Sequence, residues 1–228
     1  MCGRFSLAVD KETFESTMQS AFDLDVDYDA YALPRYNIAP SQDIPALIHD
    51  GKSYRLGSLN WGFKPAFIED STFKVVNVRS ETVASKPLFQ SSFELRRCLI
   101  IADGFFEWKN LDGKKTPMRF VHTKAPLFTM AGIYTRSVDK DGSPYYSVAI
   151  LTQAANDDMA NVHDRMPVLI KDEERLNWVH PSNNKDLAVL KNLLQKKPPG
   201  LLKHFPVSSA VNTPKNDIPE CLIPMHGS

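Results

Sequence analysis

The sequence contains few cysteines, with three among 228 residues. Cys2, Cys98 and Cys221 form no CxxC pair, and an odd number of widely separated cysteines cannot make a complete disulfide framework. A disulfide-rich secreted fold is therefore excluded, and the cysteine usage is typical of a reducing cytosol. The sequence also contains no metal-binding or cofactor-binding motif. We therefore expect no metal and no cofactor.

Long apolar runs are also missing. No run of apolar residues approaches the roughly 20 that a membrane-spanning helix needs. The first residues, MCGRFSLAVDKE, lack the charged leader and the apolar segment of a secretory signal. These absences predict a cytoplasmic protein that has no contact with a membrane.

An excess of either charge is missing as well, because 27 Lys and Arg residues balance 27 Asp and Glu residues. The total charge therefore argues against a generic polycationic nucleic-acid binder. The distribution is uneven, however: residues 71–124 contain 10 basic and 5 acidic side chains, whereas residues 1–70 contain 6 and 11. The basic middle segment is either a phosphate-binding face or an ordinary solvated surface.

What the sequence does contain is a series of short apolar runs rich in β-branched and aromatic residues, which are typical of strands. Two Asp-Gly pairs, at residues 112–113 and 141–142, lie between such runs and predict hairpins, hence an antiparallel sheet. The predicted strands are residues 45–49, 73–78, 98–102, 118–123, 126–134 and 145–152.

Helical patterns are fewer. Asp10 is a suitable N-cap for a helix to about residue 21, and Asn156 is one for a second, short helix. Residues 183–195 place their leucines on one helical face, and the polar stretch 171–200 is a candidate for a peripheral insertion. The length and the ordinary composition predict one domain of the α+β class that spans the whole chain.

The first candidate site is the N-terminus, MCGRF. Methionine aminopeptidases remove Met1 when the second side chain is small, as that of Cys2 is. Cys2 would then carry two nucleophiles, an α-amine and a thiol with ordinary pKa values of about 7.7–8.0 and about 8.5. Together they can capture an aldehyde as a five-membered thiazolidine ring, which no internal cysteine can form. The alternative is a frayed terminus with an unimportant cysteine.

The second candidate site is the segment FKVVNVRSET at residues 73–82, where a strand runs into a helix start. Asn77 is suited to hold a substrate hydroxyl or the Cys2 amine by hydrogen bonds, and Arg79 offers a fork that matches phosphate oxygens. The alternative is a polar strand end that is capped by Ser80.

The third candidate is Glu107, a carboxylate among large apolar groups in the segment ADGFFEW. Burial beside aromatic side chains raises the pKa of a carboxyl group toward neutrality and makes it a usable acid or base. The alternative is a structural glutamate paired with an arginine. Its neighbour Trp108 is expected to be a core residue rather than a stacking platform for a base.

The fourth candidate is His163, in the loop sequence VHDRMP. A loop histidine between two elements is a common position for a proton shuttle. The alternative is a structural histidine beside a local ion pair between Asp164 and Arg165.

Five separated segments of this chain together resemble the SOS response-associated peptidase (SRAP) family. The resemblance runs from Cys2 to about Pro214 and leaves a C-terminal tail, residues 215–228. It implies the SRAP fold, a single α+β domain with a β-rich, barrel-like core of antiparallel and mixed strands, peripheral helices and a cleft that binds single-stranded DNA. The segments are MCGRF, PRYNIAPSQ at 34–42, NVRSET at 77–82, GFFEW at 104–108 and HDRMP at 163–167.

The resemblance implies an abasic-site processing protein of the DNA damage (SOS) response, with DNA crosslinking and lyase-type activity. Cys2, freed of Met1, is expected to attack the aldehyde of an abasic site in single-stranded DNA and to form a stable thiazolidine crosslink that shields the lesion. Asn77 is expected to orient the Cys2 amine or the sugar. Glu107 and His163 are expected to be the acid and base pair.

Contacts with DNA are implied as well. Arg4, Arg35 and Arg79 are expected to hold phosphates, which fix the position of a strand without reading its sequence. Trp61 either stacks on an exposed base or packs in the core. The expected partner is single-stranded DNA that contains abasic sites, bound by a monomer that associates with the nucleoid when it is on DNA.

Two other functions use the same features. One is a thiol peptidase or autopeptidase, a hydrolase in which Cys2 is an N-terminal nucleophile assisted by Glu107 and His163. The other is a non-catalytic single-strand binding module in which the cysteine only packs. We rank aldehyde capture above both.

Overall fold

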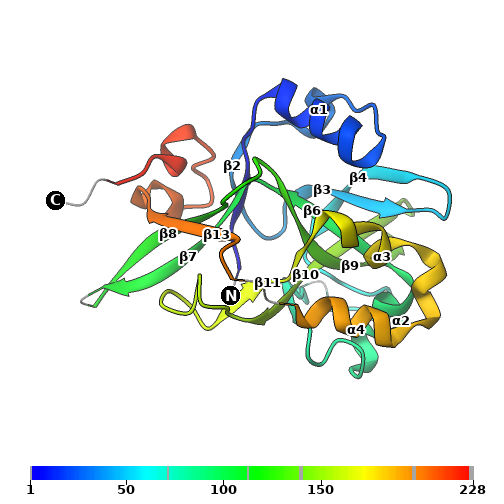
Figure 1. Ribbon diagram of the computed structural model, residues 1–228. Helices are drawn as coiled ribbons and strands as arrows, with labels where there is room; N and C mark the ends of the chain where they lie inside the picture. The colour runs from blue at the N-terminus through cyan, green and yellow to red at the C-terminus, as the bar shows by residue number, and fades with distance from the viewer. Residues whose placement is uncertain (1, 71, 112, 139–140, 197–198, 226–228) are drawn as a thin grey trace.

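The computed structural model describes residues 2–70, 72–111, 113–138, 141–196 and 199–225 (Figure 1). The strands are β1 (Phe5–Leu7), β2 (Arg35–Ile38), β3 (Asp43–His49), β4 (Tyr54–Trp61), β5 (Asn77–Arg79), β6 (Arg97–Ala102), β7 (Gly104–Leu111), β8 (Lys114–His122), β9 (Phe128–Val138), β10 (Pro144–Ala154), β11 (Arg165–Pro167), β12 (Leu169–Ile170) and β13 (Leu202–Pro206). The helices are α1 (Lys11–Phe22), α2 (Pro87–Leu95), α3 (Arg175–Val179) and α4 (Leu187–Gln195), with short 3-10 helices η1 (Tyr28–Tyr31), η2 (Asp172–Glu174), η3 (Pro181–Lys185), η4 (Ser209–Asn212) and η5 (Pro219–Leu222).

A closed barrel forms the core of the molecule. The strands pair in the order β10, β4, β3, β6 and β9, and β9 pairs back with β10. These pairings are antiparallel except for that of β4 with β10, which is parallel. Closure satisfies the backbone groups that an open sheet would leave at its edges. The predicted α+β fold with a mixed, barrel-like core is confirmed.

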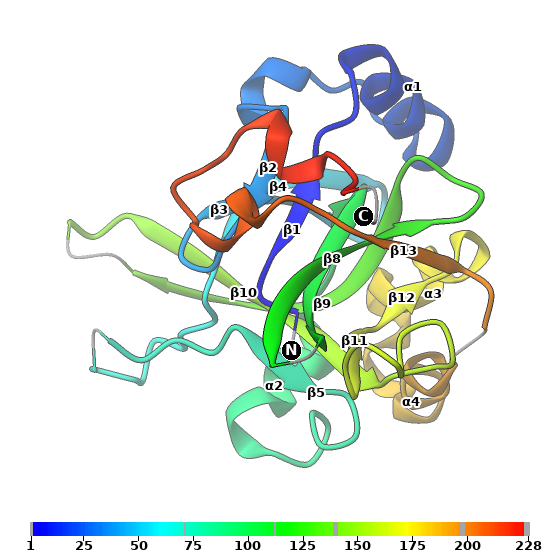
Figure 2. The ribbon, with the colours of Figure 1, turned by 90° about the vertical axis from the view of Figure 1, so that its left-hand side faces the viewer.

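A second sheet, in the order β13, β8, β7, β1 and β2, packs beside the barrel. Figure 2 shows β1, β8 and β13 on the side that faces the viewer. Within this sheet β1 lies between β2 and β7, and Phe5 is paired with Ile38 on one side and Phe105 on the other. The Phe5 ring also meets Trp61 of the barrel edge-to-face, with 5.3 Å between ring centroids. The start of the chain is therefore held between the two layers.

The helices α2, α3 and α4 cover one side of the barrel (Figure 1). Arg97 of β6 is buried beneath them and donates hydrogen bonds to the carbonyl oxygens of Phe93 (2.9 Å) and Trp178 (2.6 Å), near the C-terminal ends of α2 and α3. Those ends carry partial negative charge, which suits a buried guanidinium. Trp178 is fully buried and donates to the Cys98 carbonyl at 2.9 Å. Within the stretch 171–200, a candidate for a peripheral insertion, α3 and α4 pack onto the rest of the domain and bury Trp178, Leu190, Leu193 and Leu194.

Two predicted helix starts have different outcomes. Asp10 caps α1 as expected, because its carboxylate accepts a backbone hydrogen bond from the first turn. Asn156 begins two successive hydrogen-bonded turns rather than a helix: its carbonyl accepts from Ala160, the Met159 carbonyl accepts from His163, and a hydrogen bond from Ala155 to Asp164 joins the ends of the loop. Within the described ranges, no helix is both long and apolar enough to cross a membrane.

The strand predictions are confirmed for β3, β6, β8, β9 and β10, and both predicted hairpins are present as the β7–β8 and β9–β10 pairs. In the first hairpin Leu111 pairs with Lys114, while Asp112 lies outside the described residues. Gly113 has φ of +80°, a conformation that glycine adopts without strain. The prediction for residues 73–78 is only partly correct, because the regular strand begins at Asn77.

The C-terminal tail is part of the packed structure as far as residue 225. Cys221 is fully buried in a cluster with Phe106, Val207 and Val211, on the second sheet. The domain therefore continues beyond the predicted core boundary at about residue 214.

The contact between the sheet and the barrel yields a stability prediction. Phe105 of β7 is fully buried, stacks on Phe120 with 5.0 Å between ring centroids and meets Phe128 of the barrel. We expect Phe105→Ala to lower the free energy of unfolding by about 3–5 kcal/mol, because it removes buried area and leaves a cavity. Urea unfolding measures this, with Phe67→Ala as the matched control, since Phe67 is 69% exposed. Equal losses in the two variants would contradict this packing.

Candidate active site

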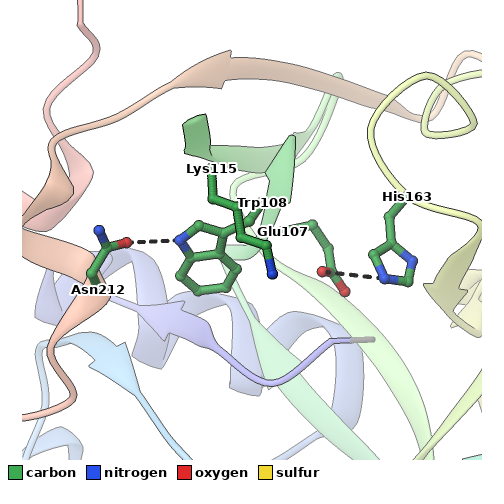
Figure 3. Close-up of a pocket in the computed structure, with 5 residues that line it drawn as sticks. All are labelled: Glu107, Trp108, Lys115, His163 and Asn212. Carbon is green, nitrogen blue, oxygen red and sulfur yellow. Dashed lines mark hydrogen bonds and ion pairs between the residues drawn. The ribbon is translucent and has the colours of Figure 1, made fainter. Parts of the chain in front are cut away.

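A pocket of about 480 Å³ lies between strands β7 and β8 of the second sheet, the 3-10 helix η4 and the loop that precedes β11. Figure 3 shows its lining side chains facing one another. They come from separate parts of the chain: β7, β8, the loop between β10 and β11, and η4. The lining residues are Glu107, Trp108, Lys115, His163 and Asn212.

Glu107 is the buried acid of this pocket. It lies in the middle of β7, and only 3% of its surface is exposed. Burial raises the pKa of its carboxyl group, while the nearby His163 opposes that shift. A carboxyl group in this environment exchanges protons closer to neutral pH than a surface glutamate does. The ion-pair contact that the structure shows for Glu107 is with a histidine, His163, rather than with an arginine.

His163 faces Glu107 across the pocket. Its Nε2 lies 3.9 Å from the Glu107 Oε2 (Figure 3), and its Nδ1 accepts a hydrogen bond from the Arg165 backbone N–H at 2.9 Å. The Asp164 carboxylate also lies 2.9 Å from Nδ1, but its side chain is 87% exposed, so solvent screens this contact. The Nε2 side of the ring therefore points toward Glu107.

An ion pair fixes the loop that carries His163. Both terminal nitrogens of Arg165 donate to the Glu81 carboxylate, at 2.7 and 2.9 Å, and Nη2 also donates to the Thr152 carbonyl at 2.7 Å. This pairing lowers the pKa of Glu81 to about 2. Arg165 is thus engaged with a distant residue, and the local ion pair with Asp164 that the sequence allowed is not formed.

Cys2 lies near Glu107 but does not line the pocket. It is fully buried, and its backbone carbonyl accepts a hydrogen bond from Asn77 Nδ2 at 2.8 Å. Burial raises the pKa of the Cys2 thiol, and the Glu107 carboxylate raises it further, because the two groups are close enough for their charges to interact. The structure therefore brings together four residues that are far apart in the sequence: Cys2, Asn77, Glu107 and His163.

The three arginines expected to hold phosphates lie in different environments. Arg79 is exposed at the end of β5, where its guanidinium can reach a ligand in solvent. Arg35 forms an ion pair with Asp217, with 2.5 Å between Nε and Oδ2. Arg4 is only 8% exposed and donates to Asn37 Oδ1 at 2.8 Å. In this arrangement Arg79 is exposed to solvent, whereas Arg4 and Arg35 are engaged with other residues of the protein.

Trp61 takes the second of its two expected positions, in the core, whereas Trp108 departs from its expected one. Trp61 is fully buried and donates from Nε1 to the Val76 carbonyl at 3.0 Å, so it packs in the core and offers no surface for a base. Trp108, which we expected in the core, is partly exposed and lines the pocket (Figure 3). Its Nε1 donates to Asn212 Oδ1 at 2.7 Å, and this bond fixes the plane of the ring.

Sequence reasoning did not identify Lys115 or Asn212 as site residues. Lys115 is exposed at the pocket rim, and the only sequence signal for it is the basic excess of residues 71–124. Asn212 carries no such signal, because it reaches the pocket only through the fold of the C-terminal segment.

The chain is similar to known proteins over nearly its whole length. A family model described as SOS response associated peptidase (SRAP) matches residues 1–214. The abasic site processing protein YoqW of Bacillus subtilis is 40% identical over 225 residues, which cover 97% of this chain and 99% of that protein. The abasic site processing protein YedK of Escherichia coli is 27% identical and covers 99% of this chain and 100% of its own length.

A solved structure supports the fold. A crystal structure of a protein from Bacteroides thetaiotaomicron superposes with a TM-score of 0.85 at 24% identity, and covers 99% of this chain and 100% of that one. At this level of identity the likeness establishes the fold alone.

The buried carboxyl group yields a prediction about pH. Because the folded state raises the pKa of Glu107 above its ordinary value of 4.5, folded protein binds this proton more tightly than unfolded protein does. The stabilisation that this bound proton gives to the folded state is therefore greatest below pH 4.5 and is lost as the pH rises through the raised pKa of Glu107. Glu107→Gln removes this loss, so its free energy of unfolding relative to wild type should increase from pH 4.5 to pH 8.

Urea unfolding at the two pH values checks this expectation. Glu69→Gln is the matched control, because Glu69 is exposed and should give the same difference from wild type at both. A Glu107→Gln difference that stays constant or shrinks toward pH 8 would argue against a buried, proton-binding carboxyl group.

Proposed function

Since this chain belongs to the SOS response-associated peptidase family, we propose that it processes abasic sites in single-stranded DNA. Its curated relatives YoqW and YedK are named abasic site processing proteins. The reactive group in our proposal is Cys2, freed of Met1, which captures the aldehyde of the ring-opened abasic sugar in a thiazolidine. The observation that carries the proposal is the convergence of Cys2, Asn77, Glu107 and His163 beside one pocket.

The proposed reaction has two bond-forming steps. The α-amine of Cys2 attacks the aldehyde carbon, and the resulting carbinolamine loses water to give an imine. The thiol then adds to the imine carbon, its proton passes to nitrogen, and the ring closes. One water molecule leaves, and no oxidant, metal or cofactor takes part.

Each step needs a proton transfer for which this site has a group. The carbinolamine hydroxyl must be protonated to leave, and a carboxyl group whose pKa is raised by burial keeps a proton to give at higher pH than a surface glutamate does. The Cys2 thiol then needs a base, because burial keeps it protonated. Glu107, having given up its proton, is that base. Before the amine attacks, His163 gives a proton to the sugar ring oxygen as the C1′–oxygen bond breaks, and the proton that the C1′ hydroxyl loses to form the aldehyde restores His163.

Asn77 holds the nucleophile in place. Its amide donates to the Cys2 carbonyl from β5, a strand that is hydrogen-bonded to the barrel through β10. A nucleophile held in one orientation reacts faster than a mobile terminus, since little conformational freedom is lost on the way to the transition state. Arg79, two residues further along the same strand, is placed to take a phosphate of the bound strand.

Mass spectrometry of the denatured protein tests the covalent step. After incubation with a single-stranded oligonucleotide that contains one abasic site, we expect an adduct equal to protein without Met1, plus DNA, minus one water. Peptide mapping should place the adduct on Cys2. Cys2→Ala should form none, whereas Cys98→Ala should form it, because Cys98 lies inside the barrel wall at β6.

Other outcomes would support a different function. Cleavage of a peptide, with no DNA adduct, would indicate the thiol peptidase instead. Binding of single-stranded DNA without any adduct would indicate a binding module. Retention of Met1 in a protein that still forms the adduct would exclude the α-amine as the attacking group.

The proton-transfer roles are tested by rates. We expect Glu107→Gln and His163→Ala each to slow adduct formation by about 100-fold or more, the usual loss when a general acid or base is removed. Single-turnover measurements at saturating abasic DNA give these rates, with Glu69→Gln as the control that should match wild type. Wild-type rates in both pocket variants would eliminate the assigned roles.

A further inference from the structure

The C-terminal segment 207–225, called here the C-terminal strap, crosses the outer edge of the second sheet at β2. Three hydrogen bonds join the strap to this strand through the Asp217 carboxylate. Its Oδ1 accepts from the backbone N–H groups of Tyr36 (2.5 Å) and Asn37 (2.9 Å), and its Oδ2 accepts from Arg35 Nε (2.5 Å). β2 is the last strand in this sheet, so its outer backbone groups need acceptors from outside the sheet. Asp217 provides them.

The contact continues inward through Asn37, which is fully buried. Its Nδ2 donates to carbonyl oxygens of the strap, at 2.7 Å for Asn216 and 3.1 Å for Thr213. Its Oδ1 accepts from Arg4 Nη1 at 2.8 Å, and the same nitrogen donates to the Val211 carbonyl at 2.6 Å. A buried guanidinium is costly unless its donors are satisfied. The strap and β2 together therefore fix the position of Arg4.

Arg4 in turn contacts both Cys2 and the pocket residue Trp108. Its backbone carbonyl accepts from the Phe106 N–H at 2.9 Å and lies 4.0 Å from the Cys2 Sγ. Its guanidinium lies over the ring of Trp108, 5.8 Å from the centroid, and Trp108 is held from the other side by Asn212 of the strap. Arg4 thus contacts both Cys2 and Trp108, which forms one wall of the pocket.

We propose that Asp217 is a positioning residue for Cys2, acting through Asn37 and Arg4. Asp217 touches neither Cys2 nor the pocket, and it lies beyond residues 1–214, the part of the chain that the family model matches. The inference rests on the proposed function for its effect on reactivity. Loss of the carboxylate releases the outer edge of β2, lets Asn37 and Arg4 shift, and leaves Cys2 less well aligned.

The matched pair of variants is Asp217→Asn and Glu220→Gln, which remove one carboxylate charge each from the same strap, Glu220 being exposed. Adduct formation is measured with abasic single-stranded DNA over a range of concentrations. We expect Asp217→Asn to lower the maximal rate by about 10- to 100-fold, because small misplacements of reacting groups have large effects on rate. The DNA concentration at half-maximal rate should stay within about two-fold of wild type, and Asp217→Glu should recover part of the rate. Glu220→Gln should behave as wild type.

A second measurement needs no DNA. The rate at which iodoacetamide alkylates Cys2 is followed by peptide mass spectrometry, with Cys98 in the same sample as the reference for global unfolding. We expect Asp217→Asn to speed alkylation of Cys2 relative to Cys98, and Glu220→Gln to leave it unchanged. Unchanged Cys2 alkylation and an unchanged maximal rate in Asp217→Asn would overturn the proposal, as would equal effects in Glu220→Gln.

The two measurements separate the two proposals. If the wild-type protein alkylates as expected but forms no DNA adduct, the proposed function fails while the positioning role of Asp217 is still decided by the alkylation rates. If Cys98 becomes reactive together with Cys2, Asp217 only stabilises the fold, and the positioning proposal is rejected.

Discussion

The backbone hydrogen bonds of β1, to β2 on one side and to β7 on the other, hold the beginning of this chain in the middle of a sheet. Most chain termini are poorly ordered because few contacts restrain them. Here the first strand begins at Phe5, so Cys2 is only three residues from a backbone that is paired on both edges. This constraint places Cys2 next to two residues from distant parts of the chain: Asn77 donates a hydrogen bond to its carbonyl, and the Glu107 carboxylate lies close enough to affect the pKa of its thiol.

The same burial that restrains the terminus determines the chemistry of the pocket. Water is kept away from Glu107, so its charged form is disfavoured and its proton is retained to higher pH. His163 faces this carboxyl group because Arg165, two residues later, is locked by Glu81. A strong ion pair on one side of a short loop thus sets the geometry of a weaker, exchangeable contact on the other. In the proposed function, the Arg165–Glu81 pair holds the structure and the His163–Glu107 pair moves protons.

Much of the barrel was predictable from the chain alone, because its strands are apolar runs bounded by turn residues. Residues 98–102 and 145–152 are examples that became β6 and β10. Strands with many polar residues, such as β2 and β4, lack that pattern and were not predicted. Asn156 illustrates the converse: a good local cap does not make a helix when a tertiary hydrogen bond, from Ala155 to Asp164, closes the loop. The polar stretch 171–200 also contains the fully buried Trp178. A composition dominated by charged and polar residues does not show that one apolar side chain anchors the segment.

The sequence by itself determined which chemical groups this protein has: a cysteine at position 2, an asparagine, a glutamate and a histidine in separate motifs, and a basic middle segment. Only the tertiary structure decided how they are used. It buried Trp61 and left Trp108 at the pocket, and it engaged Arg4 with Asn37 while it left Arg79 in solvent. The physical reason is that the burial of a side chain and its hydrogen-bond partners depend on contacts between residues far apart in the chain. One example is Asn212 of the C-terminal strap, which lines the pocket and accepts a hydrogen bond from Trp108. No local pattern of side chains encodes such a contact.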